Sequence, residues 1–92
     1  MAKKSLSQKE TIRILSRSSK KPEVVGAILE HLLTPKENEE LWVRVEVLKR
    51  LIQGEQQRAI AHDLAIGIAT VTRGSREVRR MTPEIKKIIL GG

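Results

Sequence analysis

Hydrophobic residues recur every three or four positions along most of the chain, and no segment alternates as a strand would. This periodicity predicts six helices, which cover approximately residues 6–18, 22–33, 35–53, 57–64, 68–80 and 84–90. The predicted fold class is therefore all-α. The first of these helices is the weakest, because it carries few large apolar residues.

Local signals indicate where several helices begin and end. Thr34 and Glu37 have the spacing of a capping box, and Pro35 lies at the first helical position between them. Gly54 is expected to end the long helix that follows. Thr82 precedes a proline in the same way and predicts the start of the last helix.

The long helix over residues 35–53 carries an apolar arc around about half of its circumference, wide enough to pack against more than one neighbour. The arc consists of Leu41, Val43, Val45, Val47, Leu48, Leu51 and Ile52. Arg44 lies inside this arc, where a charge is costly unless it reaches solvent or meets an anion. Two partners satisfy this requirement: an internal acid such as Glu77, or an anionic ligand. Trp42 is expected to be partly exposed or at a subunit contact.

Residues 57–80 have the pattern of a helix-turn-helix, in which two short helices flank the turn Ala65-Ile66-Gly67. The second helix begins with small residues, including Ala69 and Thr70, that would allow close approach to base edges. A basic stripe on the same helix consists of Arg73, Arg76 and Arg80. Arginines in such a stripe contact phosphates. The alternative is a helical hairpin with a solvated charged face.

Composition favours a small oligomer that binds a polyanion. The chain has 92 residues, no cysteine and a single aromatic residue, Trp42. A chain of this size buries only about 60% of its unfolded surface, so a purely aliphatic core favours a dimer. The net charge is +7, to which residues 1–21 contribute +6. This excess predicts a polyanionic partner and salt-dependent binding. An anionic membrane surface would explain the charge equally well, but no long amphipathic helix with bulky aromatic residues accompanies it.

The chain is expected to have two parts. Residues 1–21 would form a basic N-terminal arm with a weak first helix, or a disordered terminus, and residues 22–92 a helical dimerisation core.

The remaining features exclude several classes of protein. No apolar run is long enough to span a membrane and no signal peptide is recognisable, which predicts a cytoplasmic protein. Two distant histidines without cysteine give no metal site and no catalytic group, so we expect no enzyme.

The sequence resembles the bacterial tryptophan repressor family from about Leu29 to Val78. The resemblance rests on residues 32–35, 43–45, 51–55 and, most specifically, 67–75. It implies an all-helical, intertwined homodimer with a helix-turn-helix in each subunit. Such a dimer binds double-stranded operator DNA when L-tryptophan, the co-repressor, fills a pocket beside the reading helix. No other cofactor is implied.

The resemblance also implies which residues bind the ligand. Arg44 and Arg73 would sandwich the indole ring, and Arg73 would also hold the carboxylate. Thr34 would add a hydrogen bond, and the backbone carbonyls of His31 and Leu33 would accept hydrogen bonds from the ammonium group.

Three further residues belong to the implied pocket. Leu48 and Gly74 would complete its wall, and a ligand in close contact would explain a glycine in mid-helix, which costs roughly 1 kcal/mol relative to alanine. Glu77 stands where the family has a small hydroxyl residue. It would either pair with the ligand ammonium or neutralise Arg44 or Arg73.

In the turn of the helix-turn-helix, Ala65 stands where the family commonly has glycine.

The resemblance implies that five residues face DNA: Arg58, Ile68, Ala69, Thr70 and Thr72. Arg76 of the basic stripe is added to them. The chain is thus interpreted as a tryptophan-activated transcriptional repressor. Two other functions stay open at this point: a helix-turn-helix regulator that needs no ligand, and a helical module for protein interaction.

Overall fold

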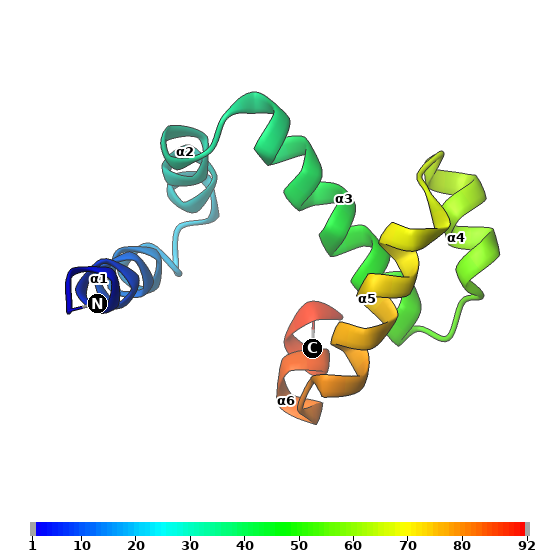
Figure 1. The fold of residues 1–92 in the computed structure, drawn as a ribbon. Coiled ribbons are helices and arrows are strands. Elements are labelled where there is room, and N and C mark those ends of the chain that lie inside the picture. Colours follow the sequence, from blue (N-terminus) through cyan, green and yellow to red (C-terminus); the bar gives the residue numbers. More distant parts are fainter. Residues whose placement is uncertain (1, 92) are drawn as a thin grey trace. The chain divides into compact units, whose positions relative to one another are not determined.

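The computed structural model describes the backbone of residues 2–91 and the side chains of residues 7–91. Residues 2–91 form six α-helices and no strand, which confirms the predicted all-α class (Figure 1). The helices are α1 (Ala2–Arg17), α2 (Pro22–Leu32), α3 (Pro35–Ile52), α4 (Gln57–Leu64), α5 (Ile68–Arg80) and α6 (Pro83–Ile89). The chain divides into two units, of which the first ends at Asn38 and the second begins at Glu39.

The start of the first helix differs from the sequence prediction. α1 begins at Ala2 rather than near Leu6, because alanine and lysine have high helix propensity and nothing in residues 2–5 interrupts a helix. After α1 the hydroxyl of Ser18 donates a hydrogen bond to the carbonyl of Leu15 (2.9 Å). A side chain that bonds a carbonyl of the last helical turn in this way helps to end α1 before Pro22.

Both predicted boundaries of α3 are confirmed by hydrogen bonds. The Thr34 backbone N–H donates to Glu37 Oε1 (2.9 Å), and the Glu37 N–H donates to Thr34 Oγ1 (3.1 Å), which is a capping box. Hydrogen bonding to the Glu37 carboxyl from the Thr34 N–H, with a smaller contribution from the Thr34 side chain, holds the pKa of Glu37 below its ordinary value. At the other end, Gly54 has a φ of +89°, and the Glu55 N–H donates to the Arg50 carbonyl (3.1 Å).

The core of the second unit takes one side chain from each of three helices. Val47 of α3, Ile60 of α4 and Val71 of α5 are fully buried against one another. Partly buried residues surround them: Val43, Leu51, Ala61, Leu64 and Ile66. The C-terminal half of α3 is therefore the support on which α4 and α5 pack (Figure 1).

The turn between α4 and α5 contains a residue in an unfavourable conformation. Ala65 has a φ of +54°, in the left-handed region, and its N–H donates to the His62 carbonyl (3.2 Å). A residue with a Cβ in this region costs about 1–2 kcal/mol. Gly67, by contrast, has a φ of −67° and directly precedes α5. The positive φ of this turn therefore falls on alanine, although a glycine lies two residues away.

Gly74 allows α5 to approach α3 closely. A Cβ at this position would lie 2.9 Å from Val47 Cγ1 and 3.2 Å from Leu51 Cδ1. Both distances are shorter than ordinary van der Waals contact, so a Cβ at position 74 fits only if the side chains of Val47 and Leu51 shift. The sequence suggested ligand contact as the reason for this glycine, whereas the structure supplies a packing reason within the protein itself.

Apolar side chains remain exposed in both units. They are Ile12, Ile14, Val24, Leu32, Trp42, Val45, Ile68, Ile85, Ile88 and Leu90. Trp42 is 63% exposed, in agreement with the sequence prediction, and Val45 of the apolar arc is 49% exposed. The arc on α3 is therefore only partly covered within one chain. Among the described residues, no helix combines the length and apolar character needed to cross a membrane.

We expect two glycine substitutions to change stability in opposite directions. Gly74→Ala should lower the free energy of unfolding by about 1–2 kcal/mol, because overpacking outweighs the roughly 1 kcal/mol gained in helix propensity. Gly26→Ala in α2 should raise it by about 0.5–1 kcal/mol, because nothing lies within 4 Å of the added Cβ. Urea denaturation at one fixed protein concentration measures both values. Equal effects at the two positions would contradict the packing role of Gly74.

Candidate ligand pocket and nucleic-acid interface

A pocket of about 150 Å³ lies between α3 and α5 within the second unit. Its lining consists of Arg44, Val47, Leu48, Thr70, Arg73, Gly74 and Glu77. A cavity of this volume is large enough for a small aromatic ring. The structure thus brings together five residues that the sequence analysis assigned to a ligand: Arg44, Leu48, Arg73, Gly74 and Glu77.

The pocket combines an apolar wall with charged side chains. Val47 and Leu48 supply aliphatic surface from α3, while Gly74 contributes no side chain on the facing helix. Arg44 and Arg73 are both exposed and add guanidinium groups from opposite helices. Such a site suits a flat apolar group that carries a charged substituent, because the ring contacts the wall and the substituent stays near solvent.

The charged groups of the pocket do not neutralise one another. Among side chains 7–91, neither Arg44 nor Arg73 forms an ion pair or hydrogen bond. Glu77 instead pairs with Arg80 on its own helix (3.4 Å), where both side chains are largely exposed. Of the two partners that the sequence allowed for Arg44, the internal pair with Glu77 is thus not formed.

Three predicted ligand residues belong to the first unit. His31 lies in the last turn of α2, and Leu33 and Thr34 connect α2 to α3. The Thr34 hydroxyl already accepts a hydrogen bond from the Glu37 N–H. Their participation in the pocket stays a prediction.

The exposed end of α5 carries most of the residues predicted to face DNA. Ile68 is 48% exposed, and Ala69, Thr70 and Arg76 are exposed as well. Thr70 also lines the pocket, so one residue belongs to both surfaces. Arg58 is exposed on α4.

Thr72 differs from the other predicted DNA-facing residues. It is half-buried, and its hydroxyl lies 2.9 Å from Gln57 Oε1 and 3.0 Å from the Ile68 carbonyl. The contact with Gln57 ties α5 to the first turn of α4. In this structure the Thr72 hydroxyl therefore joins the two helices of the helix-turn-helix.

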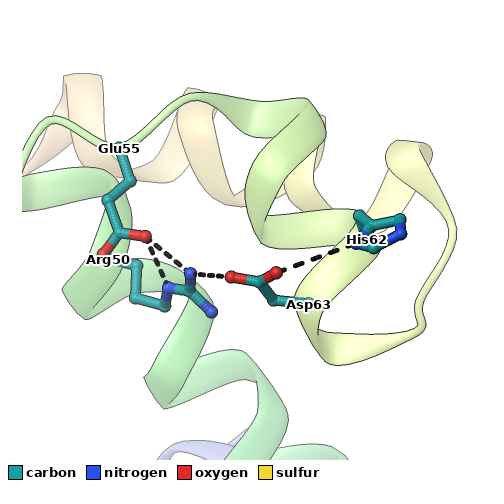
Figure 2. A network of polar contacts seen from close by, with 4 residues as sticks. All are labelled: Arg50, Glu55, His62 and Asp63. Carbon is teal, nitrogen blue, oxygen red and sulfur yellow. Dashed lines mark hydrogen bonds and ion pairs between the residues drawn. The ribbon is translucent and has the colours of Figure 1, made fainter.

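A polar cluster at the end of α3 escaped the sequence analysis. Figure 2 shows Arg50 between two carboxylates, with His62 beyond the second. Arg50 Nε donates to Glu55 Oε1 (2.8 Å), and Arg50 Nη2 donates to Asp63 Oδ2 (2.6 Å). His62 Nδ1 lies 3.8 Å from Asp63 Oδ1. No local pattern marks this cluster, because Arg50 and Asp63 are separated by 13 positions and lie on different helices.

The cluster shifts the pKa values of Arg50 and Asp63. The Glu55 carboxylate, followed by that of Asp63, raises the pKa of Arg50 above its ordinary value. The hydrogen bond from Arg50, supported by its charge, lowers the pKa of Asp63. Both directions favour the charged forms and so strengthen the attachment between α3 and α4.

Comparison with known proteins decides the family. The family model described as Trp repressor protein matches residues 7–90. The chain belongs to the Trp repressor family. The match includes the pocket, the helix-turn-helix and the cluster around Arg50. Among the described residues, no group of three or more His, Cys, Asp and Glu side chains is arranged to hold a metal ion.

Curated members of the Trp repressor family are similar to this chain over alignments of different length. A Trp operon repressor homolog of Vibrio parahaemolyticus serotype O3:K6 (strain RIMD 2210633) is 46% identical over 66 residues, which are 71% of this chain and 64% of that protein. One from Aliivibrio fischeri (strain MJ11) is 47% identical over 60 residues, 64% of this chain and 56% of its own length. One from Vibrio cholerae serotype O1 (strain ATCC 39315 / El Tor Inaba N16961) is 37% identical over 83 residues, 89% of this chain and 81% of its own. The chain thus spans less than two thirds of the first two relatives.

We expect Asp63→Asn to destabilise this member of the Trp repressor family in a pH-dependent way. Because the pKa of Asp63 in the folded protein lies below its ordinary value of 3.8, its contribution is complete above that value. It is lost as the pH falls through the folded pKa. The stability difference between the parent protein and the Asp63→Asn variant should therefore be constant from neutral pH to about pH 5 and shrink below about pH 4.

Urea midpoints at several pH values measure this difference. The groups facing Asp63 are Arg50 and His62, so both proteins carry His62→Gln, which leaves Arg50 as the partner under test. Glu10→Gln is a control, because the partners of Glu10 among side chains 7–91 are exposed arginines on α1. A difference that persists unchanged at pH 2 would contradict the role of the Asp63 carboxylate.

Proposed function

We propose that this protein is a cytoplasmic DNA-binding transcriptional repressor that acts as a homodimer and uses L-tryptophan as its co-repressor. The observation that carries the proposal is the pocket between α3 and α5. It places two guanidinium groups, unpaired among the described side chains, beside an apolar wall and directly behind the exposed tip of the helix-turn-helix. Membership in the Trp repressor family and relatives named Trp operon repressor homologs support the same function. The proposal includes no catalytic step.

The chemistry of the pocket fits a zwitterionic amino acid with a flat side chain. The indole ring lies against Val47 and Leu48, between the guanidinium groups of Arg44 and Arg73, which favour an aromatic face. Arg73 also pairs with the carboxylate. His31, Leu33 and Thr34 stay candidate ligand residues, as the family resemblance implies.

Glu77 supplies a negative charge for the ligand ammonium. Its existing partner, Arg80, offers only an exposed pair at 3.4 Å on the same helix, which contributes little to stability. Glu77 can therefore exchange this partner for a ligand at small cost. The alternative use of Glu77, as a neutralising partner for Arg44, is not the arrangement found here.

DNA binding is assigned to the exposed end of the helix-turn-helix. α5 enters the major groove, where Ile68, Ala69 and Thr70 approach base edges. Phosphate contacts come from Arg58 and Arg76, and from Thr72 once its hydroxyl turns from α4. In a dimer, two such helices read half-sites about one helical turn apart.

The ligand acts by fixing the angle of the reading helix. Because the pocket walls come from α3 and α5, a ligand between them favours one arrangement of the two helices over others. Thr70 lies on both the pocket and the DNA face, so the two surfaces move together. Affinity for the ligand and for the operator are then coupled in both directions.

The exposed apolar side chains support a homodimer. Within residues 7–91, only Val47, Ile60 and Val71 form a fully buried hydrophobic core. Trp42 and Val45 on α3, by contrast, remain open to solvent. A second copy that covers these surfaces would bury the apolar area that a single chain of this size lacks.

Calorimetric titration with L-tryptophan tests the co-repressor. We expect saturable binding at one site per subunit, and loss of at least about tenfold in affinity in Arg73→Ala, because a charge-assisted hydrogen bond contributes roughly 1.5–3 kcal/mol. Arg79→Ala is the matched control, since Arg79 is an exposed arginine of α5 that does not line the pocket. Full affinity in Arg73→Ala would disprove the pocket assignment, and no heat from the folded wild-type dimer would disprove the co-repressor.

Thr70→Ala tests base recognition. The probe is a duplex that the wild-type protein enriches from a random-sequence pool with saturating L-tryptophan, compared with a scrambled duplex. Affinity for the enriched duplex should fall by at least about fivefold, because a base contact contributes roughly 1–3 kcal/mol. Affinity for the scrambled duplex should barely change. An equal loss on both duplexes would place Thr70 on the DNA backbone.

A further inference from the structure

Arg50 differs from the other arginines whose ion pairs the structure describes. Its side chain is only 16% exposed, whereas the paired side chain of Arg80 is 77% exposed. Asp63, a partner of Arg50, is 54% exposed, but the contacts of Arg50 are shorter, at 2.6 Å against 3.4–3.6 Å for the pairs on α1 and α5. Because short charge-assisted hydrogen bonds have a well-defined geometry, Arg50 forms a more directional contact than those pairs.

One guanidinium group connects three segments of the second unit. Arg50 stands in the last turn of α3, Glu55 follows the glycine turn that ends α3, and Asp63 lies in the last turn of α4 (Figure 2). Arg50 Nη2 lies 2.6 Å from a carboxylate oxygen of each acid. The far end of α4 is thereby held against the end of α3.

The segment that Arg50 holds is unfavourable by itself. Asp63 places a negative charge near the C-terminus of α4, where the helix dipole favours cations. Two residues later, Ala65 occupies the left-handed region. Arg50 supplies the missing positive charge at the point where this turn begins, and the same turn leads directly into α5.

Two kinds of contact attach the helix-turn-helix to α3. The first is apolar packing, in which Val47 is buried with Ile60 and Val71 and lies close to Gly74, and the second is the Arg50 cluster one turn further along α3. Apolar packing is not directional, whereas hydrogen-bonded ion pairs fix an orientation. Neither Arg50 nor its two acids lines the ligand pocket.

We propose that Arg50 is a positioning residue that sets the orientation of α4 and α5 on α3, so that selective DNA binding depends on a side chain that contacts neither DNA nor co-repressor. This role rests on the proposed DNA-binding function. Arg50 acts through Asp63 and Glu55, and loss of the cluster leaves the reading helix attached to α3 by packing alone.

The test compares Arg50→Met with Lys49→Met. Methionine keeps an apolar stem at position 50 but removes the guanidinium group, and Lys49 is an exposed neighbour on the same helix that loses the same charge. We expect affinity for the enriched duplex to fall about fivefold or more in Arg50→Met, the lower end of typical coupling effects. Affinity for the scrambled duplex should change no more than in Lys49→Met, because nonspecific binding depends on charge alone.

Two further measurements separate positioning from a general loss of stability. Asp63→Asn leaves the Arg50–Glu55 pair in place. It should also lower the affinity for the enriched duplex, but by less than Arg50→Met does. Backbone residual dipolar couplings should show α4 and α5 reoriented relative to α3 in folded Arg50→Met. Arg50→Lys, which keeps the charge without the planar fork, should restore only part of the affinity.

The outcomes that would overturn the proposal differ from those for the function itself. If Arg50→Met and Lys49→Met lose equal affinity for the enriched duplex, Arg50 acts only as a surface charge. Unchanged affinity of Asp63→Asn for the enriched duplex would lead to the same conclusion. Unchanged dipolar couplings in Arg50→Met would overturn the positioning role even without DNA. Failure of the wild-type protein to enrich any duplex would overturn the DNA-binding function, and the role of Arg50 in it.

Discussion

The close contact between α3 and α5 at Gly74 is the constraint on which the second unit depends. With no side chain at position 74, α5 lies directly against Val47, which is buried with Ile60 and Val71 in the small core. Gly74 and Val47 also line the pocket, together with Arg44 and Arg73. One missing methyl group thus shapes both the core and the candidate ligand site.

Three arginines of this unit, Arg44, Arg50 and Arg73, have contrasting surroundings. Arg50 faces two carboxylates and is satisfied within the chain, whereas Arg44 and Arg73 face no acid with which they pair among the described side chains. Satisfied charges fix structure, and unsatisfied charges beside an apolar wall are available to a ligand. The pocket and the attachment of the helix-turn-helix are thereby built from the same residue type in separate places.

Sequence alone predicted the features that depend on neighbouring residues. The capping box at Thr34, the glycine that ends α3 and the positions of the helices all follow from contacts within a few residues. The start of α1 was missed because no local signal marks it. The packing reason for Gly74 and the Arg50 cluster were missed because each joins different helices, and helical periodicity does not specify which faces meet. Five of the residues that line the pocket were assigned to a ligand from the apolar arc of α3 and the family resemblance. Val47 was placed in the arc but not assigned to the ligand, and Thr70 was assigned to DNA instead.

Trp42 gives this protein an unusually simple optical spectrum. The sequence has no tyrosine and no second tryptophan, so one exposed indole accounts for essentially all of the near-ultraviolet absorbance and intrinsic emission of the chain. A solvated indole emits at longer wavelength than one in an apolar interface, so the emission maximum directly reports whether α3 is covered at this point. A bound tryptophan would add a second indole between charged groups, and the two chromophores would report separately on assembly and on occupancy.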